Sequence, residues 1–281
     1  MSRPTPEPAP VTTATPVVVM AASMFGRSLA GHRGAGRNSE CVLPRGGEIG
    51  CDTGGMDSSS PMPLAEANPF PEAIDPRLRR QLTFLIEADR LKTVLRQSPL
   101  AAADRRENDA EHSWHLALMA LVLAEHADEE IDVGHVIALV VVHDLVEIYA
   151  GDTPLYDVAM AADQQERETA AAQTLFALLP ADQAAAVRAL WDEFEAEKTP
   201  EARFAKAVDR LEPLLLNWMA RGGTWRTPGV TADDSRARKA VIANASASLW
   251  RAGKELIDES ERRGWSRPGR PAAPPSGRPP R

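Results

Sequence analysis

One short stretch, residues 136–152, constrains the fold of this chain more than any other. It reads VIALVVVHDLVEIYAGD, an apolar run that carries His143, Asp144 and Glu147 before it stops at Gly151. At about 100° per residue on an α-helix, Asp144 lies about 100° and Glu147 about 40° from His143, so all three share one face. An imidazole and carboxylates buried there without partners would cost several kcal/mol. The stretch therefore predicts a buried helix whose polar groups are paired or hold a metal ion.

The rest of the central chain predicts an all-α fold, a compact multi-helix bundle. Apolar residues recur at helical spacing, and capping residues mark helix starts at Asp75-Pro76, at Asn108 with Glu111, and at Thr199-Pro200. No long segment alternates with period two, and no hairpin turn joins two β-branched runs. The expected helices cover residues 76–98, 107–127, 136–150, 157–179, 182–196, 200–221 and 231–262.

Proline, glycine and serine are concentrated at the two ends of the 281-residue chain. They crowd into roughly the first 70 and the last 16 residues, a composition typical of disordered segments. We therefore expect a disordered extension over residues 1–70, a folded domain over residues 71–265 and a disordered Arg/Pro tail over residues 266–281.

The charge of the chain argues against a nucleic-acid polymer as a partner. The formal net charge is −8, and the C-terminal tail carries four arginines and no acid, so the folded part is more acidic than the whole. Binding to nucleic acid needs basic surface to neutralise phosphates. No apolar run reaches the ~20 residues that span a bilayer, so no membrane is expected either. Cys41 and Cys51 are the only cysteines, which rules out a disulfide framework in the folded part and favours the reducing cytoplasm.

Four polar residues stand within apolar helical patterns without a local explanation: His112, His143, Asp144 and Asp209. Pro213 follows Asp209 by one turn and cannot donate to its carbonyl, which predicts a kink beside a buried acid. Two imidazoles and two carboxylates suit a divalent ion of intermediate hardness. The alternative is a set of buried ion pairs, for example His143 with Asp209, and buried ions are costly to desolvate.

The order of these residues resembles the HD-domain superfamily of metal-dependent phosphohydrolases, and within it the 5′-deoxynucleotidase branch. The similarity extends over most of residues 75–220. An HD dipeptide alone is a weak signal, whereas the full set of motifs in order is a strong one. The matching motifs are Arg90-Leu91-Lys92, Arg96, Glu107-Asn108, Glu111-His112-Ser113, His143-Asp144 with Glu147, Gly151-Asp152 and Lys206-Ala207-Val208-Asp209.

The resemblance implies a helical enzyme that removes the 5′-phosphate from (deoxy)nucleoside monophosphates by attack of metal-bound water. Glu147 and Asp152 would lie near the attacking water, and Arg96 near the phosphate or the sugar. Gln97 stands where the bacterial branch has a tryptophan beside the sugar, so discrimination against ribonucleotides does not follow from the resemblance. The implied metal ligands are His112, His143, Asp144 and Asp209.

The histidine count favours a single metal ion. HD enzymes that hold two metals draw further histidines from the segment between the HD pair and the distal acid. No histidine follows His143 in this chain. We therefore expect one divalent ion, with Mn, Co, Fe, Ni, Zn and Mg as the candidates.

Two other functions compete with the nucleotidase hypothesis. The first is an HD hydrolase of another phosphate ester or of a nucleoside triphosphate. The second, from a different class, is a non-catalytic helical module that binds a metal or a nucleotide. In each case the partner is a small phosphate compound, and the Leu and Trp content of the last helices is consistent with a homodimer.

Overall fold

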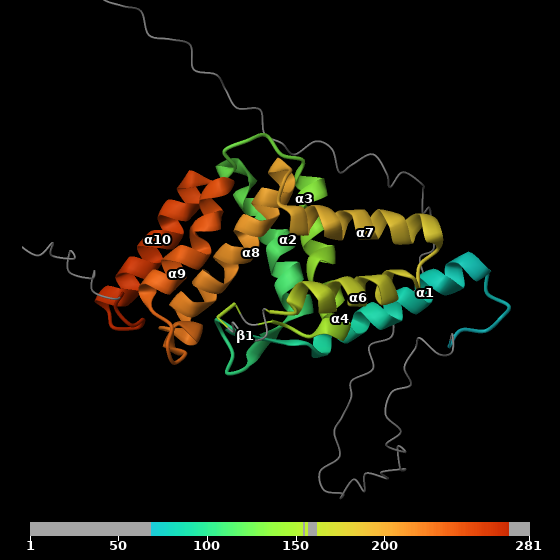
Figure 1. Cartoon of the computed structure of the whole chain (residues 1–281), viewed down its shortest axis with the longest axis horizontal. Helices are drawn as coiled ribbons and strands as arrows, with labels where there is room; N and C mark the ends of the chain where they lie inside the picture. The colour runs from blue at the N-terminus through green and yellow to red at the C-terminus, as the bar shows by residue number, and fades with distance from the viewer. Residues whose placement is uncertain (1–68, 154, 157–161, 270–281) are drawn as a thin grey trace, which may run out of the picture. The chain divides into compact units, whose positions relative to one another are not determined.

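A computed structural model of the chain describes residues 69–153, 155–156 and 162–269 (Figure 1). Contacts separate the chain into Met1–Ser58 and Ser59–Arg281, and all described residues belong to the second unit. The predicted extension over residues 1–70 lies outside the described residues apart from its last two. Of the predicted tail, residues 266–269 are described: Ser266 is buried, and its hydroxyl hydrogen-bonds that of Ser260 at 2.8 Å.

The described residues are predominantly helical, which confirms the all-α prediction (Figure 1). The α-helices are α1 (Pro76–Ala88), α2 (Asp109–Leu123), α3 (Val133–Val142), α4 (Glu147–Ala150), α6 (Gln164–Phe176), α7 (Ala181–Ala196), α8 (Pro200–Met219), α9 (Ala232–Lys239) and α10 (Ala247–Arg262). Short 3₁₀ turns join or extend them: η1 (Asp89–Thr93), η2 (Ala124–His126), η3 (His143–Val146), η4 (Gly223–Arg226) and η5 (Ala240–Asn244).

The predicted helix starts are confirmed by their capping bonds. The Asp75 carboxylate accepts from the backbone N–H groups of residues 77 and 78 at the start of α1. Asn108 and Glu111 form a reciprocal capping box at the start of α2. The Thr199 hydroxyl accepts from the N–H of Ala202 at the start of α8. Each bond satisfies a backbone donor that has no partner within its own helix.

The prediction of one helix over residues 76–98 is wrong beyond Ala88, where α1 ends. After η1 the chain forms strand β1 (Leu95–Pro99), which pairs antiparallel with β2 (Arg106–Asn108). Side chains alternate along β1: Leu95 is exposed, whereas Arg96 is largely buried. The buried carboxylates that Arg96 meets outweigh the helical preference of the local sequence, because an unpaired buried carboxylate is costly. The sequence pattern could not reveal these distant partners.

The predicted helix over residues 136–150 is divided at the HD pair. α3 ends at Val142, η3 follows, and α4 carries Glu147 to the turn at Gly151, whose φ of 75° suits glycine. In a 3₁₀ turn, residues three apart lie above one another. Asp144 and Glu147 therefore face the same way, and their carboxylate oxygens lie within 4.8 Å of each other.

Helix α8 is the centre of the packing. It contacts α2, α3, α7, α10 and η5, and in Figure 1 it runs between the α9–α10 pair and the α2–α3 pair. It remains one helix through Pro213, which leaves the carbonyl of Asp209 without its usual donor. Phe204, Val208 and Leu214 are fully buried on this helix. Their burial holds the intervening Asp209 against α2 in the interior.

The predicted helix over residues 231–262 is also divided, because a serine interrupts it. Ser246 is fully buried, accepts from the N–H of Leu249 and donates to the carbonyl of His126 at 2.6 Å. Its side chain thus caps α10 and ties the start of that helix to η2, the 3₁₀ turn that follows α2. This bond spans 120 residues of sequence, so a local pattern could not show it.

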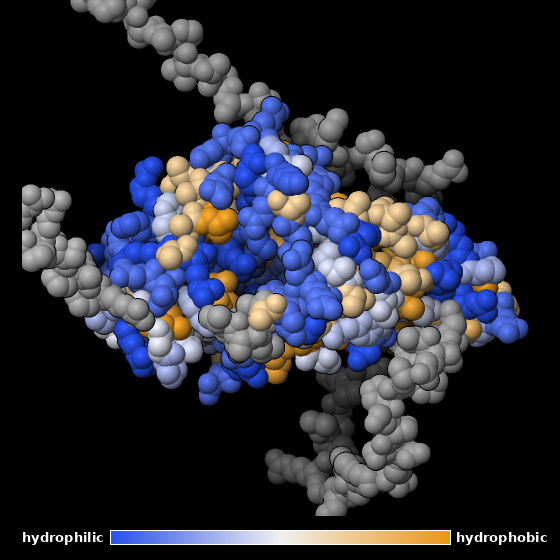
Figure 2. Space-filling model, viewed as in Figure 1, coloured by the Kyte–Doolittle hydropathy of each residue, from blue (hydrophilic) through white to orange (hydrophobic). Residues whose placement is uncertain are grey.

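Segment Val133–Ala150 is long and apolar enough to cross a membrane by composition alone. In the structure, Val136, Leu139 and Val140 within it are completely buried in the helical core. Packing against α2, α7 and α8 accounts for the apolar composition of this segment. The outer face shown in Figure 2 is mostly hydrophilic, with separate hydrophobic patches.

Candidate metal centre

The four predicted metal ligands converge from three elements. His112 comes from the second turn of α2, His143 and Asp144 from η3, and Asp209 from the middle of α8. The Nε2 of His112 lies 3.2 Å from Oδ1 of Asp209 and 4.0 Å from Oδ2 of Asp144. The Nε2 of His143 lies 3.0 Å from Oδ1 of Asp144. All four side chains are buried, so the fold brings them together in the interior.

The orientation of His143 fits a metal ligand. Its Nδ1 donates to the carbonyl of Val140 at 2.8 Å, which leaves Nε2 buried with only the Asp144 carboxylate beside it, at 3.0 Å and outside hydrogen-bond geometry. Ligands at 2.0–2.2 Å from one ion are about 3.0–3.5 Å apart, and the two closest ligand pairs above match this spacing. The example ion pair of His143 with Asp209 is not formed, since Asp209 meets His112 instead. The donor set therefore fits a divalent ion.

A second pair of carboxylates lies behind His112. Its Nδ1 is 3.4 Å from Oε2 of Glu212 and 3.6 Å from Oε2 of Glu107, and both acids are buried. Glu212 also meets Nδ1 of His115 at 3.1 Å. Burial opposes protonation of His112, but the surrounding carboxylates outweigh it and raise its pKa well above the usual range. Neither carboxylate has hydrogen-bond geometry to Nδ1, but their charges beside the remote nitrogen favour the ring orientation in which Nε2 points at the site.

Arg96 contacts carboxylates on three sides. Its Nη1 lies 2.8 Å from Oδ2 of Asp144 and 3.3 Å from Oδ1 of Asp109, and its Nε lies 3.8 Å from Oε2 of Glu107. The Arg96 side chain is only 13% exposed. Its guanidinium thus orients a candidate metal ligand. Among the described residues only Nη1 makes hydrogen bonds, to Asp144 and Asp109, and Nε is enclosed without a hydrogen-bond partner. Contact of this guanidinium with a phosphate or a sugar stays a prediction.

Glu147 and Asp152, the predicted proton-transfer residues, lie beside the candidate ligands. The carboxylate oxygens of Asp109, Asp144 and Glu147 are all within 4.8 Å of one another. Burial, reinforced by the charges of Asp144 and Asp109, holds the pKa of Glu147 well above its usual range. Burial and the charge of Asp144 raise the pKa of Asp109 to about 6. Burial also raises the pKa of Asp152. Three neighbouring carboxyl groups thus have a raised affinity for protons.

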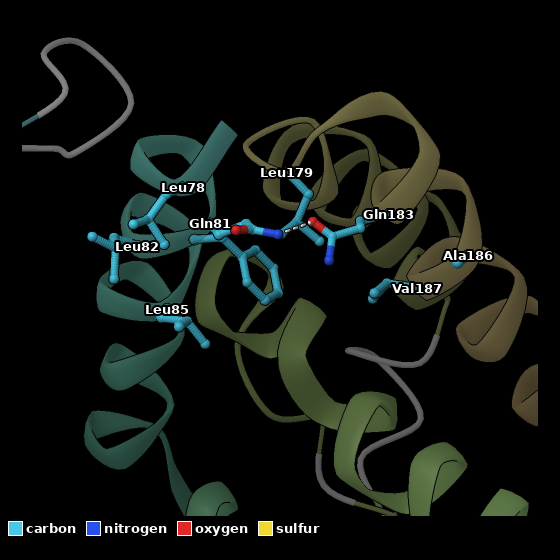
Figure 3. A pocket seen from close by; sticks show the side chains of 9 residues that line it. Leu78, Gln81, Leu82, Leu85, Leu179, Gln183, Ala186 and Val187 are labelled. Carbon is cyan, nitrogen blue, oxygen red and sulfur yellow. Dashed lines mark hydrogen bonds between the residues drawn. The ribbon is translucent and has the colours of Figure 1, made fainter. Parts of the chain in front are cut away.

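A cavity of about 1070 Å³ opens onto this cluster. Every predicted site residue lines it except His112, which is completely buried. A smaller cavity of about 490 Å³ lies between α1 and α7, where Gln81 donates to Gln183 at 2.7 Å (Figure 3). Its described lining contains no charged side chain. The larger cavity is therefore the candidate active site.

The sequence analysis assigned no site role to three acids that lie beside the candidate ligands, although Glu107 stands in one of the motifs of the resemblance. Glu107 and Asp109 flank the helix cap at Asn108, a position where acids ordinarily complement the helix dipole. Glu212 lies three residues after Asp209 on α8, within one helical turn. That spacing was a readable signal, because residues three apart on a helix share a face.

Known proteins resemble this chain in sequence. The model of the family described as HD domain matches residues 88–250. The 5′-deoxynucleotidase HDDC2 of Bos taurus is 31% identical over 153 residues, which are 54% of this chain and 73% of the bovine protein. The human protein of the same name is 30% identical over 138 residues, which are 49% of this chain and 66% of that protein.

A solved structure gives a further likeness. The crystal structure of a predicted metal-dependent phosphohydrolase from Magnetospirillum magnetotacticum is 50% identical in sequence and superposes with a TM-score of 0.66. The match covers 72% of this chain and all of that protein. The chain is therefore similar in fold and in sequence to a solved protein of that description.

Proposed function

This chain belongs to the HD domain family and is a metal-dependent phosphohydrolase, and we propose that it removes the 5′-phosphate from (deoxy)nucleoside monophosphates. The two curated relatives described above, both named 5′-deoxynucleotidase, support this choice of substrate. The observation that carries the proposal is the meeting of four potential ligands in the interior. His143, Asp144 and Asp209 line one cavity, and the enclosed His112 lies 3.2 Å from Asp209.

In the proposed site, these four residues would hold one divalent ion, from among Mn, Co, Fe, Ni, Zn and Mg. Such an ion, when bound, polarises phosphate oxygens and makes water more acidic. The chain supplies the orientation: Glu212 and Glu107 face the far nitrogen of His112, and Val140 holds the ring of His143. Each contact reduces the freedom of a ligand to turn away from the ion.

Proton transfer is assigned to Glu147 and Asp152. Both line the cavity, and Glu147 is carried by α4 directly behind the HD turn. A carboxyl group beside the reacting phosphate can accept a proton from the attacking water or donate one to the leaving oxygen. Asp109, which lies within 4.8 Å of Glu147, is placed to share that proton.

Gln97 is the residue relevant to discrimination between ribose and deoxyribose. It lines the cavity from β1, next to Arg96. A glutamine side chain offers both a hydrogen-bond donor and an acceptor, and it is smaller than a tryptophan. We therefore propose that both deoxyribonucleotides and ribonucleotides can enter the site.

The test is phosphate release from a panel of deoxyribonucleoside and ribonucleoside 5′-monophosphates. Mn, Co, Mg and Zn are each added to protein stripped of metal. Wild type, Asp144→Ala and the exposed-surface control Asp182→Ala are compared, and bound metal is measured in each. We expect Asp144→Ala to lose both metal and turnover, and the control to keep both.

The outcomes separate the competing functions. Metal-dependent release from another ester, or release of triphosphate from a nucleoside triphosphate, would retain the site and refute the monophosphate assignment. Tight nucleotide binding without turnover under any metal would favour the non-catalytic module. Full activity in Asp144→Ala would refute the metal assignment itself.

Two broader expectations stay proposals. Cytoplasmic location rests on the lack of a disulfide framework, and fractionation of cells would test it. The proposal of a homodimer is based on α1 and α2 and no longer on the last helices. Large exposed hydrophobic side chains lie on α1 and α2, among them Leu85, Trp114, Leu121 and Val122. Light scattering of the purified chain would test its oligomeric state.

A further inference from the structure

The cavity wall carries more positive charge than the mechanism above uses. Among the described residues that line it, the cationic side chains are Arg96, Lys206, Arg210, Arg238 and Lys239. Four of these lie near an acceptor. Arg96 meets carboxylates, Lys206 lies 3.7 Å from Glu195, and Arg238 donates to the carbonyl of Leu155 at 2.6 Å. Arg210 lies 3.4 Å from Asp209 without a hydrogen bond, and Lys239 has neither a hydrogen bond nor an ion pair among the described residues.

Lys239, the last residue of α9, is 3% exposed. Within the described part of the chain its ammonium group makes no hydrogen bond and no ion pair. Its side chain lines the cavity. Burial, with the nearby charge of Arg210, lowers the pKa of Lys239 to about 7. A buried cation without a counterion is unfavourable unless an anion binds beside it.

Arg210 lines the same cavity as Lys239 and is near enough for its charge to act on that lysine. Its Nη1 is 3.4 Å from Oδ2 of Asp209, whose other oxygen faces His112. The Arg210 side chain is 26% exposed and makes no hydrogen bond among the described residues. Its guanidinium therefore has several free N–H donors beside a predicted ligand. Such donors match the oxygens of a phosphate group.

The charge of the cavity explains why such donors are needed. Seven acids line it, among them Asp144, Glu147, Asp152 and Asp209. A phosphate monoester carries up to two negative charges, so it enters this space only where cations face it. One divalent ion would offset part of the acidic charge, and the charge of Arg96 is shared among three carboxylates. Lys239, which has no ion pair among the described residues, and Arg210, which has one long contact with Asp209, remain as cations for the phosphate.

We propose that Lys239 and Arg210 form a phosphate-binding subsite that holds the phosphate group of the substrate against the metal centre. This proposal rests on the proposed phosphohydrolase function. It assigns a contact with phosphate to α8 and α9, whereas the family resemblance placed Arg96 near the phosphate or the sugar. Lys239 is then left without a partner in the free protein because its partner is the substrate.

The first test uses inorganic phosphate as the probe. Calorimetry on the full-length, metal-loaded protein compares wild type, Lys239→Met, Arg210→Gln and the control Lys254→Met, which removes an exposed lysine from α10. We expect phosphate to bind about 10- to 100-fold more weakly to the first two variants, the loss that follows from removing one charge-assisted hydrogen bond. The control should bind as wild type. Unchanged phosphate affinity in both variants would overturn the proposal.

The second test uses hydrolysis and separates the two levels of inference. We expect the same two substitutions to raise KM for the best nucleoside monophosphate by a similar factor, with bound metal unchanged. If no ester is hydrolysed by wild type but phosphate binding is lost in both variants, the subsite stands and the proposed function fails. If esters are hydrolysed with unchanged KM in both variants, the proposed function stands and the subsite fails. Should Lys239→Met not fold, Arg210→Gln carries both tests alone.

Discussion

Replacing Arg96 by methionine should destabilise the protein strongly, because this arginine is the cation among three buried acids. The change keeps most of the aliphatic stem and removes the guanidinium. Asp144, Asp109 and Glu107 would then face one another without it. A matched control exists in Arg77, which contacts Asp182 at a nearly equal distance, 2.7 Å against 2.8 Å, but with a side chain that is 51% exposed.

The expected size follows from burial. Removing one partner of a buried ion pair costs about 3–5 kcal/mol, because the remaining charges are left uncompensated. For a folded domain of roughly 200 residues, each kcal/mol lowers the melting temperature by about 2–4 °C. Arg96→Met should therefore melt about 6–20 °C below wild type. Arg77→Met should melt close to wild type, since solvent screens exposed pairs.

The assay is thermal unfolding followed by circular dichroism, without and with a divalent cation. An added cation should restore part of the lost stability, because it offsets the same carboxylates. An Arg96→Met protein that melted within about 2 °C of wild type would refute this reasoning. If that protein also showed a raised KM, Arg96 would be a substrate contact, as the sequence comparison implied.

Three further substitutions probe other parts of the site. Glu147→Gln should lower kcat by about 10²–10⁴-fold while bound metal is unchanged, and full turnover would exclude Glu147 from proton transfer. Gly223→Ala should destabilise by about 1–3 kcal/mol in urea unfolding. The added Cβ at residue 223 would clash with Oδ1 of Asn217. The control is Gly229→Ala, which is also at positive φ but whose added Cβ would meet nothing within 4 Å. Equal loss of stability in the two variants would count against the steric argument. Gln97→Trp should raise the ratio of kcat/KM for deoxyribonucleotides over ribonucleotides, and an unchanged ratio would remove Gln97 from sugar recognition.

The sequence by itself determined the helical class and the candidate ligands. Helix periodicity and capping are local, so Asp75, Asn108 and Thr199 could be read as helix starts without knowledge of the fold. The candidate ligands were also readable, because a buried histidine or acid violates the apolar pattern around it. His143 and Asp144 stood out for that reason alone.

Only the tertiary structure decided which polar groups meet. Arg96 and Asp144 are 48 residues apart, and His112 and Asp209 are 97 apart, so no periodicity relates them. The same distant partners hold Arg96 in a strand where local preference predicted a helix. The packing of α9 likewise places Lys239 in the wall of a cavity, with no ion pair among the described residues. Pairing between remote segments depends on how the helices pack, and that packing follows from the whole apolar core rather than from any window of sequence.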